Sequence, residues 1–214
     1  MPALDPQTAK KSHSVSAANI INHNQVDYKL VKSWIRECFQ NHSGCSSGYH
    51  GPAVGMKVID CERRKLAKHE PGQRYLALSY VWGPSKPEGL IATPENIFNK
   101  SPRVIRDAIH VTRELGYRYL WVDRYCINQA GGKEKTDQLE QMDLIYENAD
   151  LTIVAGSGQD DRHGLPGAGT KSTKEPLLPR SRQPVANIGN TTLLSTLPEI
   201  SHYLEKSKWT TRGW

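Results

Sequence analysis

The most constraining stretch of the sequence runs from Arg118 to Gln129 and reads RYLWVDRYCINQ. Its first half, residues 119–122, is a short apolar run rich in aromatic and β-branched side chains, which is typical of a strand buried on both faces. Polar and reactive side chains follow where this strand should end, namely Asp123, Arg124, Cys126, Asn128 and Gln129. Open α/β sheets present their sites at the carboxyl ends of buried strands, so we expect the rest of the chain to frame this edge.

Composition favours an intracellular protein that forms a core of ordinary size. The chain has 214 residues, of which 37% are hydrophobic. No window approaches the run of about 18 apolar residues that a membrane span needs. Four cysteines without an apolar leader at the N-terminus predict reduced thiols and a cytoplasmic, non-secreted location.

The net charge of +6 is compatible with nucleic acid as a partner, but the basic residues are scattered and usually have acidic neighbours. A solvated surface is the favoured interpretation, and we expect no specific nucleic-acid binding. Binding through surface lysines and arginines remains a third, weaker alternative.

The chain divides into three predicted parts. Residues 1–28 are polar and are predicted to be a disordered tail. Residues 29–74 are predicted to form a helix and strand extension, with helical spacing of apolar residues over 28–42, a strand at 56–59 and a charged turn through 62–65. Residues 75–214 are predicted to be the core domain.

Strands and helices alternate in this core. Strands are predicted at 75–80 and 151–155 on either side of the organising stretch in sequence. A helix is predicted after Ser101, with an apolar stripe through Val104, Ala108, Val111 and Leu115, and a second helix is predicted at 134–148. Alternation with short connections predicts an α/β fold with a mainly parallel sheet and helices on both faces, preceded by the N-terminal helix.

The parallel arrangement would gather three strand ends at one edge. A functional edge is therefore predicted from Ser79, Tyr80, Trp82, Gly83, Asp123, Arg124, Cys126, Asn128, Gln129, Ser157 and Asp160, with Asp161 beside them. Beyond it, residues 162–190 are predicted to be a long exposed loop, followed by a short strand at 190–195 and a short helix at 199–206.

Four ordered blocks carry a resemblance to a known family: LSYVWG at 78–83, WVDRYCINQ at 121–129, QMDLIYENADLTIVAGSG at 141–158 and WTTRGW at 209–214. They resemble the fungal heterokaryon incompatibility (HET) domain, as do HGLPG at 163–167 and the Trp34, Cys38, His42, Cys45 pattern. The resemblance implies a role in non-self recognition, as a cell-death effector or signalling module that acts through a protein partner or self-association. The family's last block usually continues into a glutamine-glutamate pair, so the resemblance also implies a core truncated at its C-terminus.

The HET family has been likened to TIR domains, which share the parallel α/β plan and in some members cleave NAD with a glutamate. The resemblance thus implies a three-layer sandwich of TIR-like or flavodoxin-like type, and it leaves a TIR-like NAD-cleaving enzyme as the alternative function. By analogy the glutamate would lie just beyond Trp214, and this chain would then be inactive. NAD is a possible substrate, and no cofactor or catalytic residue is assigned.

Two residue sets, a possible nucleophile pair and a possible metal-ligand set, each allow a functional and a structural interpretation. Asp123 and Cys126 could pair a carboxylate with a thiol nucleophile, but such a thiol needs a base, for which His110 and His163 are the candidates. A capping aspartate and a buried cysteine are the structural alternative.

The set Cys38, His42 and Cys45, with His50 or Cys61 as a fourth ligand, has residue types that zinc prefers. Its spacing matches no standard zinc finger. A helix end packed by small thiols is therefore favoured over a metal site.

Overall fold

A computed structural model describes residues 21–46, 55–84, 91–169, 179–180, 182–195 and 200–211. Its main element is a five-stranded sheet in the order β2-β1-β4-β3-β5. The strands are β1 (Lys57–Asp60), β2 (Lys65–Lys68), β3 (Tyr75–Ser79), β4 (Tyr119–Trp121) and β5 (Leu151–Val154). Most of the predicted tail, residues 1–20, lies outside the described residues, and the proposed domain boundaries stay a prediction.

The centre of the sheet is parallel, as the sequence predicted. Strand β3 pairs in parallel with β4 on one side and with β5 on the other, so that Leu76 lies opposite both Leu120 and Leu151. All five residues of β3 are buried, which explains why its sequence is apolar without alternation.

The sheet as a whole is mixed, and the prediction of a mainly parallel sheet was wrong. Strand β1 pairs antiparallel with β4 and with β2. Only residues 61–64 join β1 to β2, and a connection this short can join only antiparallel neighbours. We predicted this segment as a charged turn and did not recognise β2 as the strand that returns from it.

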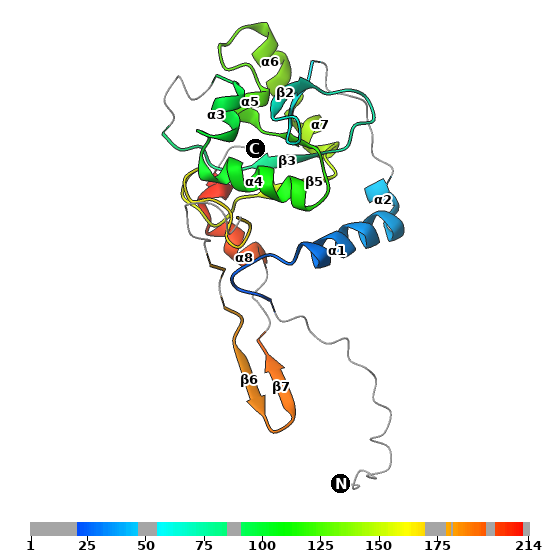
Figure 1. Cartoon of the computed structure of the whole chain (residues 1–214), viewed down its shortest axis with the longest axis vertical. Helices are drawn as coiled ribbons and strands as arrows, with labels where there is room; N and C mark the ends of the chain where they lie inside the picture. The colour runs from blue at the N-terminus through cyan, green and yellow to red at the C-terminus, as the bar shows by residue number, and fades with distance from the viewer. Residues whose placement is uncertain are drawn as a thin grey trace.

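Helices lie on both faces of the sheet (Figure 1). They are α1 (Tyr28–Asn41), α2 (Ser43–Ser46), α3 (Pro94–Phe98), α4 (Arg103–Glu114), α5 (Asp123–Cys126), α6 (Lys133–Leu139), α7 (Met142–Glu147), α8 (Ile200–Glu205) and the 3₁₀ helix η3 (Lys208–Thr211). Because β4 and β5 flank β3 on opposite sides, right-handed crossovers place α4 on one face and α6–α7 on the other. This arrangement is compatible with a three-layer sandwich.

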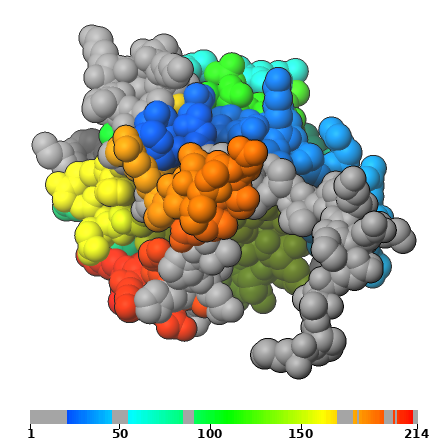
Figure 2. Space-filling view, turned by 90° about the horizontal axis from the view of Figure 1, so that it is seen from below, coloured from blue at the N-terminus to red at the C-terminus, as the bar shows by residue number. Residues whose placement is uncertain are grey.

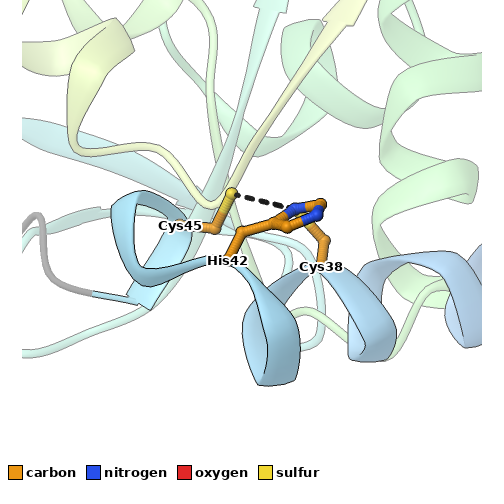
Figure 3. Close-up of side chains that lie close together, drawn as sticks. All are labelled: Cys38, His42 and Cys45. Carbon is orange, nitrogen blue, oxygen red and sulfur yellow. Dashed lines mark hydrogen bonds between the residues drawn. The ribbon is translucent and has the colours of Figure 1, made fainter.

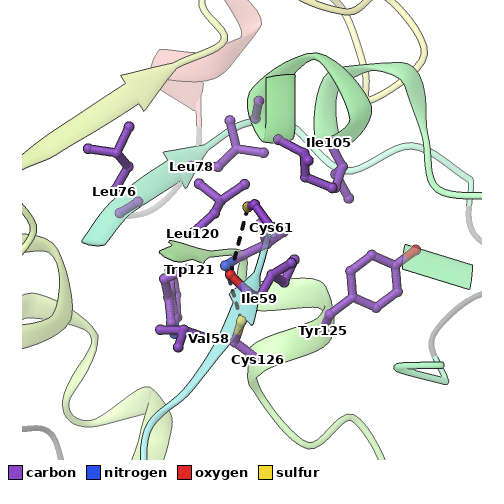
Figure 4. Packing of buried hydrophobic residues seen from close by; sticks show 14 of the residues in the cluster. Val58, Ile59, Cys61, Leu76, Leu78, Ile105, Leu120, Trp121, Tyr125 and Cys126 are labelled. Carbon is purple, nitrogen blue, oxygen red and sulfur yellow. Dashed lines mark hydrogen bonds between the residues drawn. The ribbon is translucent and has the colours of Figure 1, made fainter. Parts of the chain in front are cut away.

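The core follows the alternation of side chains along the strands. Leu78 and Leu120 lie beside Ile105 of α4, and all three side chains are completely buried (Figure 4). Trp121 points to the opposite face, where its ring meets Tyr146 of α7 edge-on at 5.3 Å between centroids. The single helix predicted at 134–148 is broken between Leu139 and Met142 into α6 and α7.

The segment after β5 is only partly an exposed loop. Leu165 and Ala168 are buried, and the Leu165 amide donates to the Asp107 carboxylate at 2.8 Å. Gly164 has a φ of +80°, and a Cβ there would lie 2.5 Å from Asp107 Oδ2, so this turn needs glycine. Asp107 is therefore buried beneath the HGLPG turn.

Two peripheral elements complete the described chain. An antiparallel hairpin of β6 (Val185–Ile188) and β7 (Thr191–Leu194) projects away from the body (Figure 1), and Figure 2 views it end-on. Strand β7 and helix α8 confirm the short strand and helix predicted near the C-terminus, whereas β6 lies inside the predicted loop. Among the described residues, no helix has the length and apolar content that crossing a bilayer requires.

A buried carboxylate fixes the hairpin turn between β1 and β2. Asp60 is 1% exposed, and its oxygens accept from the Glu62 and Arg63 amides and from the Arg118 guanidinium at 2.7 Å. Burial by itself raises the pKa of Asp60, but the hydrogen bonds from Arg118 and Arg63 outweigh it, and the net pKa is lowered.

An Asp60→Asn variant should therefore lose stability in a pH-dependent manner. A carboxyl whose folded pKa is lowered stabilises the fold above its unfolded pKa of about 3.9, and this contribution is lost as the pH falls through the folded pKa. Urea unfolding should show the wild type more stable than the variant at pH 7, with the difference vanishing on acidification below about pH 4. A difference that is constant with pH would contradict this role for Asp60.

Candidate functional site

The carboxyl ends of the three parallel strands meet at one edge, as predicted. The segments that leave them carry a carboxyl-edge cluster, which we define as Trp82, Gly83, Asp123, Arg124 and Asp161. The Asp161 carbonyl also accepts from the Val104 amide at 3.1 Å, so the start of α4 closes against this cluster.

Asp123 organises the segment after β4. Its Oδ2 accepts from the Trp82 indole Nε1 at 2.9 Å, and its Oδ1 accepts from the Arg124 amide at 2.7 Å. Its backbone carbonyl accepts from Gln129 Nε2 at 3.0 Å, which closes the loop after α5. The Asp123 side chain thus binds the neighbouring Arg124 amide, although the N-cap of α5 is Val122 and no side chain caps this helix.

A buried ion pair links the ends of β4 and β5. Arg124 Nη1 donates to Asp161 Oδ2 at 2.7 Å, and both side chains are 5% exposed. The guanidinium also lies 5.7 Å from the centre of the Trp82 ring, within range of a cation–π contact. A Cβ on Gly83 would lie 2.0 Å from Asp161 Oδ1, so this glycine permits the carboxylate to approach the backbone.

The base of the cluster is formed by the end of β3. Tyr80 is 1% exposed, and burial together with the nearby Asp123 carboxylate raises the pKa of its hydroxyl well above the ordinary value. Ser79 Oγ accepts from the Trp209 indole at 2.8 Å, which ties η3 to the sheet. The raised pKa keeps Tyr80 protonated at neutral pH. The hydrogen bond from Trp209 makes the C-terminal segment part of this edge.

Three of the predicted residues lie away from the cluster. Asn128 donates to Glu134 of α6, Ser157 is exposed, and Asp160 pairs with its neighbour Arg162. Two adjacent aspartates follow β5, and no local pattern shows that Asp161 rather than Asp160 turns inward. Trp209 was visible in the sequence only as part of a family-like block.

Cys126 does not have the environment of a nucleophile. Its Sγ is buried and accepts from the Val122 amide at 3.3 Å, and burial raises the pKa of its thiol to about 12. Of the two candidate bases, His110 packs edge-on against Tyr28, and His163 is exposed on the loop after β5. Since catalysis requires the thiolate, this cysteine is a core residue.

Thiol labelling should show this distinction directly. In the folded, reduced chain at pH 8 we expect a soluble alkylating reagent to modify Cys38 and Cys45 but neither Cys61 nor Cys126, which are 2% and 1% exposed. Peptide mass mapping would locate the label, and labelling in denaturant provides the control for full reactivity. Fast labelling of Cys126 in the native chain would contradict its assignment to the core.

A second cluster lies at the end of α1, where Cys38, His42 and Cys45 come together (Figure 3). All three potential ligand atoms lie within 4.8 Å of one another. Of the two suggested fourth ligands, Cys61 is in the core with its Sγ 3.8 Å from the Ile59 carbonyl, and His50 lies outside the described residues.

A groove of about 1280 Å³ runs between α1 and the amino ends of β3, β4 and β5. We call it the α1 groove, and its walls include Trp34, Cys38, Cys45, Arg74 and Tyr119. It lies at the end of the parallel strands opposite to the carboxyl-edge cluster.

These features define an α/β domain whose strand ends are closed by an internal cluster of paired side chains. The family described as "Heterokaryon incompatibility protein (HET)" matches residues 75–214, and the chain belongs to this family. The sequence-based recognition is thereby confirmed.

Two curated proteins are similar to the chain. "Heterokaryon incompatibility protein 6, OR allele" of Neurospora crassa is 32% identical over 105 residues, which cover 42% of this chain and 15% of that protein. "Homeobox protein Hox-C12b" of Danio rerio is 23% identical over 164 residues, which cover 74% of this chain and 52% of that protein. The chain thus spans only part of the length of both relatives, and no solved structure matches it.

Proposed function

We propose that this chain is a signalling module of fungal non-self recognition, which promotes cell death by binding a protein partner or a second copy of itself. The binding surface is the carboxyl edge of the sheet. Family membership and the similarity to the Neurospora protein support the biological role. The proposed mode of action rests on one observation. The carboxylates of this edge, Asp123 and Asp161, are hydrogen-bonded to the neighbouring side chains of Trp82 and Arg124.

The closed cluster favours binding over catalysis. The Asp123 and Asp161 carboxylates hold the Trp82 indole and the Arg124 guanidinium, and both aspartates are buried. A general acid or base must reach a substrate proton, and a nucleophile must be ionised. Cys126 is neither exposed nor ionised, so it does not meet this requirement. The carboxyl-edge cluster instead holds the three strand ends in one rigid surface.

The rim of the carboxyl-edge cluster, which we define as Trp82, Gln159 and Arg162, carries the groups that a partner would meet. Gln159 and Arg162 are exposed, and Trp82 is half-buried. Tryptophan and arginine are enriched among the residues that dominate protein interfaces. A rigid surface also limits the ordering cost of binding.

The proposal is tested by charge reversal on the rim. Expression of the chain in a filamentous fungus should arrest growth, and Arg162→Glu should abolish the arrest. Lys68→Glu, which reverses an exposed charge on the outer strand β2, is the matched control and should retain it. Because Arg162 pairs with Asp160, thermal unfolding of both variants checks that the fold is retained.

Two outcomes would contradict the proposal. One is growth arrest that Arg162→Glu and a second rim variant, Gln159→Arg, leave intact. The other is consumption of NAD by the purified chain that Asp123→Asn abolishes without unfolding it, which would support the TIR-like enzyme. That alternative comes from the family resemblance, and no contact among the described residues favours it.

A further inference from the structure

The end of α1 brings two thiols and an imidazole together through local backbone geometry. His42 follows the last helical residue, and its amide donates to the Cys38 carbonyl at 3.0 Å, which keeps the two side chains on one helix face. The Cys45 amide then donates to the His42 carbonyl at 3.1 Å, and this turn returns the Cys45 thiol to the same face.

The separations of the three ligand atoms resemble those of a metal site. Cys38 Sγ lies 3.0 Å from Cys45 Sγ, and His42 Nδ1 lies 3.4 Å from the first sulfur and 4.0 Å from the second. A tetrahedral Zn²⁺ site with ordinary bond lengths separates two sulfurs by about 3.8 Å and a sulfur from a nitrogen by about 3.6 Å. Each observed separation is within about 0.8 Å of these values.

We propose that Cys38, His42 and Cys45 bind one thiophilic divalent cation of the Zn²⁺ class. Two thiolates and an imidazole are ligands that zinc favours, whereas Mg²⁺ and Ca²⁺ require oxygen ligands. Cys38 and Cys45 line the α1 groove, so a fourth ligand can approach from solvent on that side. Three protein ligands leave one coordination position for water or another small ligand.

Such a cation would supply stability that packing does not supply to α1. No residue of α1 is fully buried, although Tyr28, Val31 and Ile35, on its N-terminal and middle turns, pack against the core. In the last turn, the Phe39 ring lies 4.8 Å from the Arg74 guanidinium, and both residues line the α1 groove. A metal bridge from this turn to α2 would hold the C-terminal end of α1 in place.

The proposal is tested by titrating the metal-free, reduced chain with Zn²⁺ and with Co²⁺ as a spectroscopic substitute. We expect one bound ion per chain and thiolate-to-cobalt charge-transfer absorption. When Zn²⁺ is present, Cys38 and Cys45 should no longer react with a thiol reagent. Each of Cys38→Ser, Cys45→Ser and His42→Ala should weaken binding by more than the roughly 10–100-fold that loss of an outer-shell partner costs. His163→Ala, which removes an exposed histidine elsewhere, is the matched control and should bind normally.

A disulfide between Cys38 and Cys45 is the competing explanation for two sulfurs at this distance. It would remove both thiols in air without metal, and a reductant rather than a chelator would restore them. That result, with no uptake of Zn²⁺ by the reduced chain, would overturn the proposal. Cobalt spectra that persist unchanged in His42→Ala would also overturn it, because the imidazole would then not be a ligand.

Discussion

An Asp161→Ala substitution is expected to lower the free energy of unfolding by about 3–5 kcal/mol, because it leaves a buried guanidinium without its counter-charge. Arg124 and Asp161 are both 5% exposed and are joined at 2.7 Å. Water cannot replace the lost carboxylate without entering the space between the ends of β4 and β5. Urea unfolding at neutral pH, followed by circular dichroism, measures the loss.

The double variant Arg124→Met with Asp161→Leu separates charge from packing. Apolar replacement of a complete buried ion pair is often neutral or stabilising, so the double variant should recover most of the stability lost by the single one. A double variant as unstable as Asp161→Ala would show that the pair contributes mainly through shape. A single variant within about 0.5 kcal/mol of the wild type, the range of ordinary surface changes, would contradict burial of the pair.

The second large effect is expected from Trp121→Ala, which should cost about 3–5 kcal/mol by leaving a cavity between β4 and α7. Trp121 is 1% exposed, and its ring packs edge-on against Tyr146. The matched control is Trp34→Ala on α1, where the side chain is 55% exposed. Thermal or urea unfolding should show a small change for Trp34→Ala, and equal losses in the two variants would contradict the assignment of the core.

The buried ion pair also bears on the proposed function. If Asp161→Ala unfolds the chain, loss of signalling in this variant reports only the loss of the fold. The rim residue Arg162 provides the sharper test, because its side chain is 73% exposed and is not part of the carboxyl-edge cluster. Comparing the two positions distinguishes a surface that binds from a framework that supports it.

Local sequence patterns predicted much of the sheet centre and its edge. The apolar runs at 75–80, 119–122 and 151–155 each form a strand, and the spacing of Val104 and Ala108 predicts the buried face of α4. Strand ends in a parallel sheet share an edge, and this rule alone predicts that Trp82, Asp123 and Arg124 lie close together. The four ordered blocks were sufficient to recognise the HET family.

Sequence by itself determined these elements because strand and helix periodicities are local properties, recorded within a few consecutive residues. Tertiary structure decided the mixed character of the sheet, because the direction of β1 depends on its pairing with the distant strand β4, as in the register of Asp60 with Tyr119. It also decided the partners of Asp107 and Asp161, which turn inward because the Leu165 amide and the Arg124 guanidinium, both distant in sequence, satisfy their carboxylates. A buried charge is stable only where such a partner is present. Asp107 also has a local partner in Arg103, one helical turn earlier, but the partner of Asp161 is supplied by the fold.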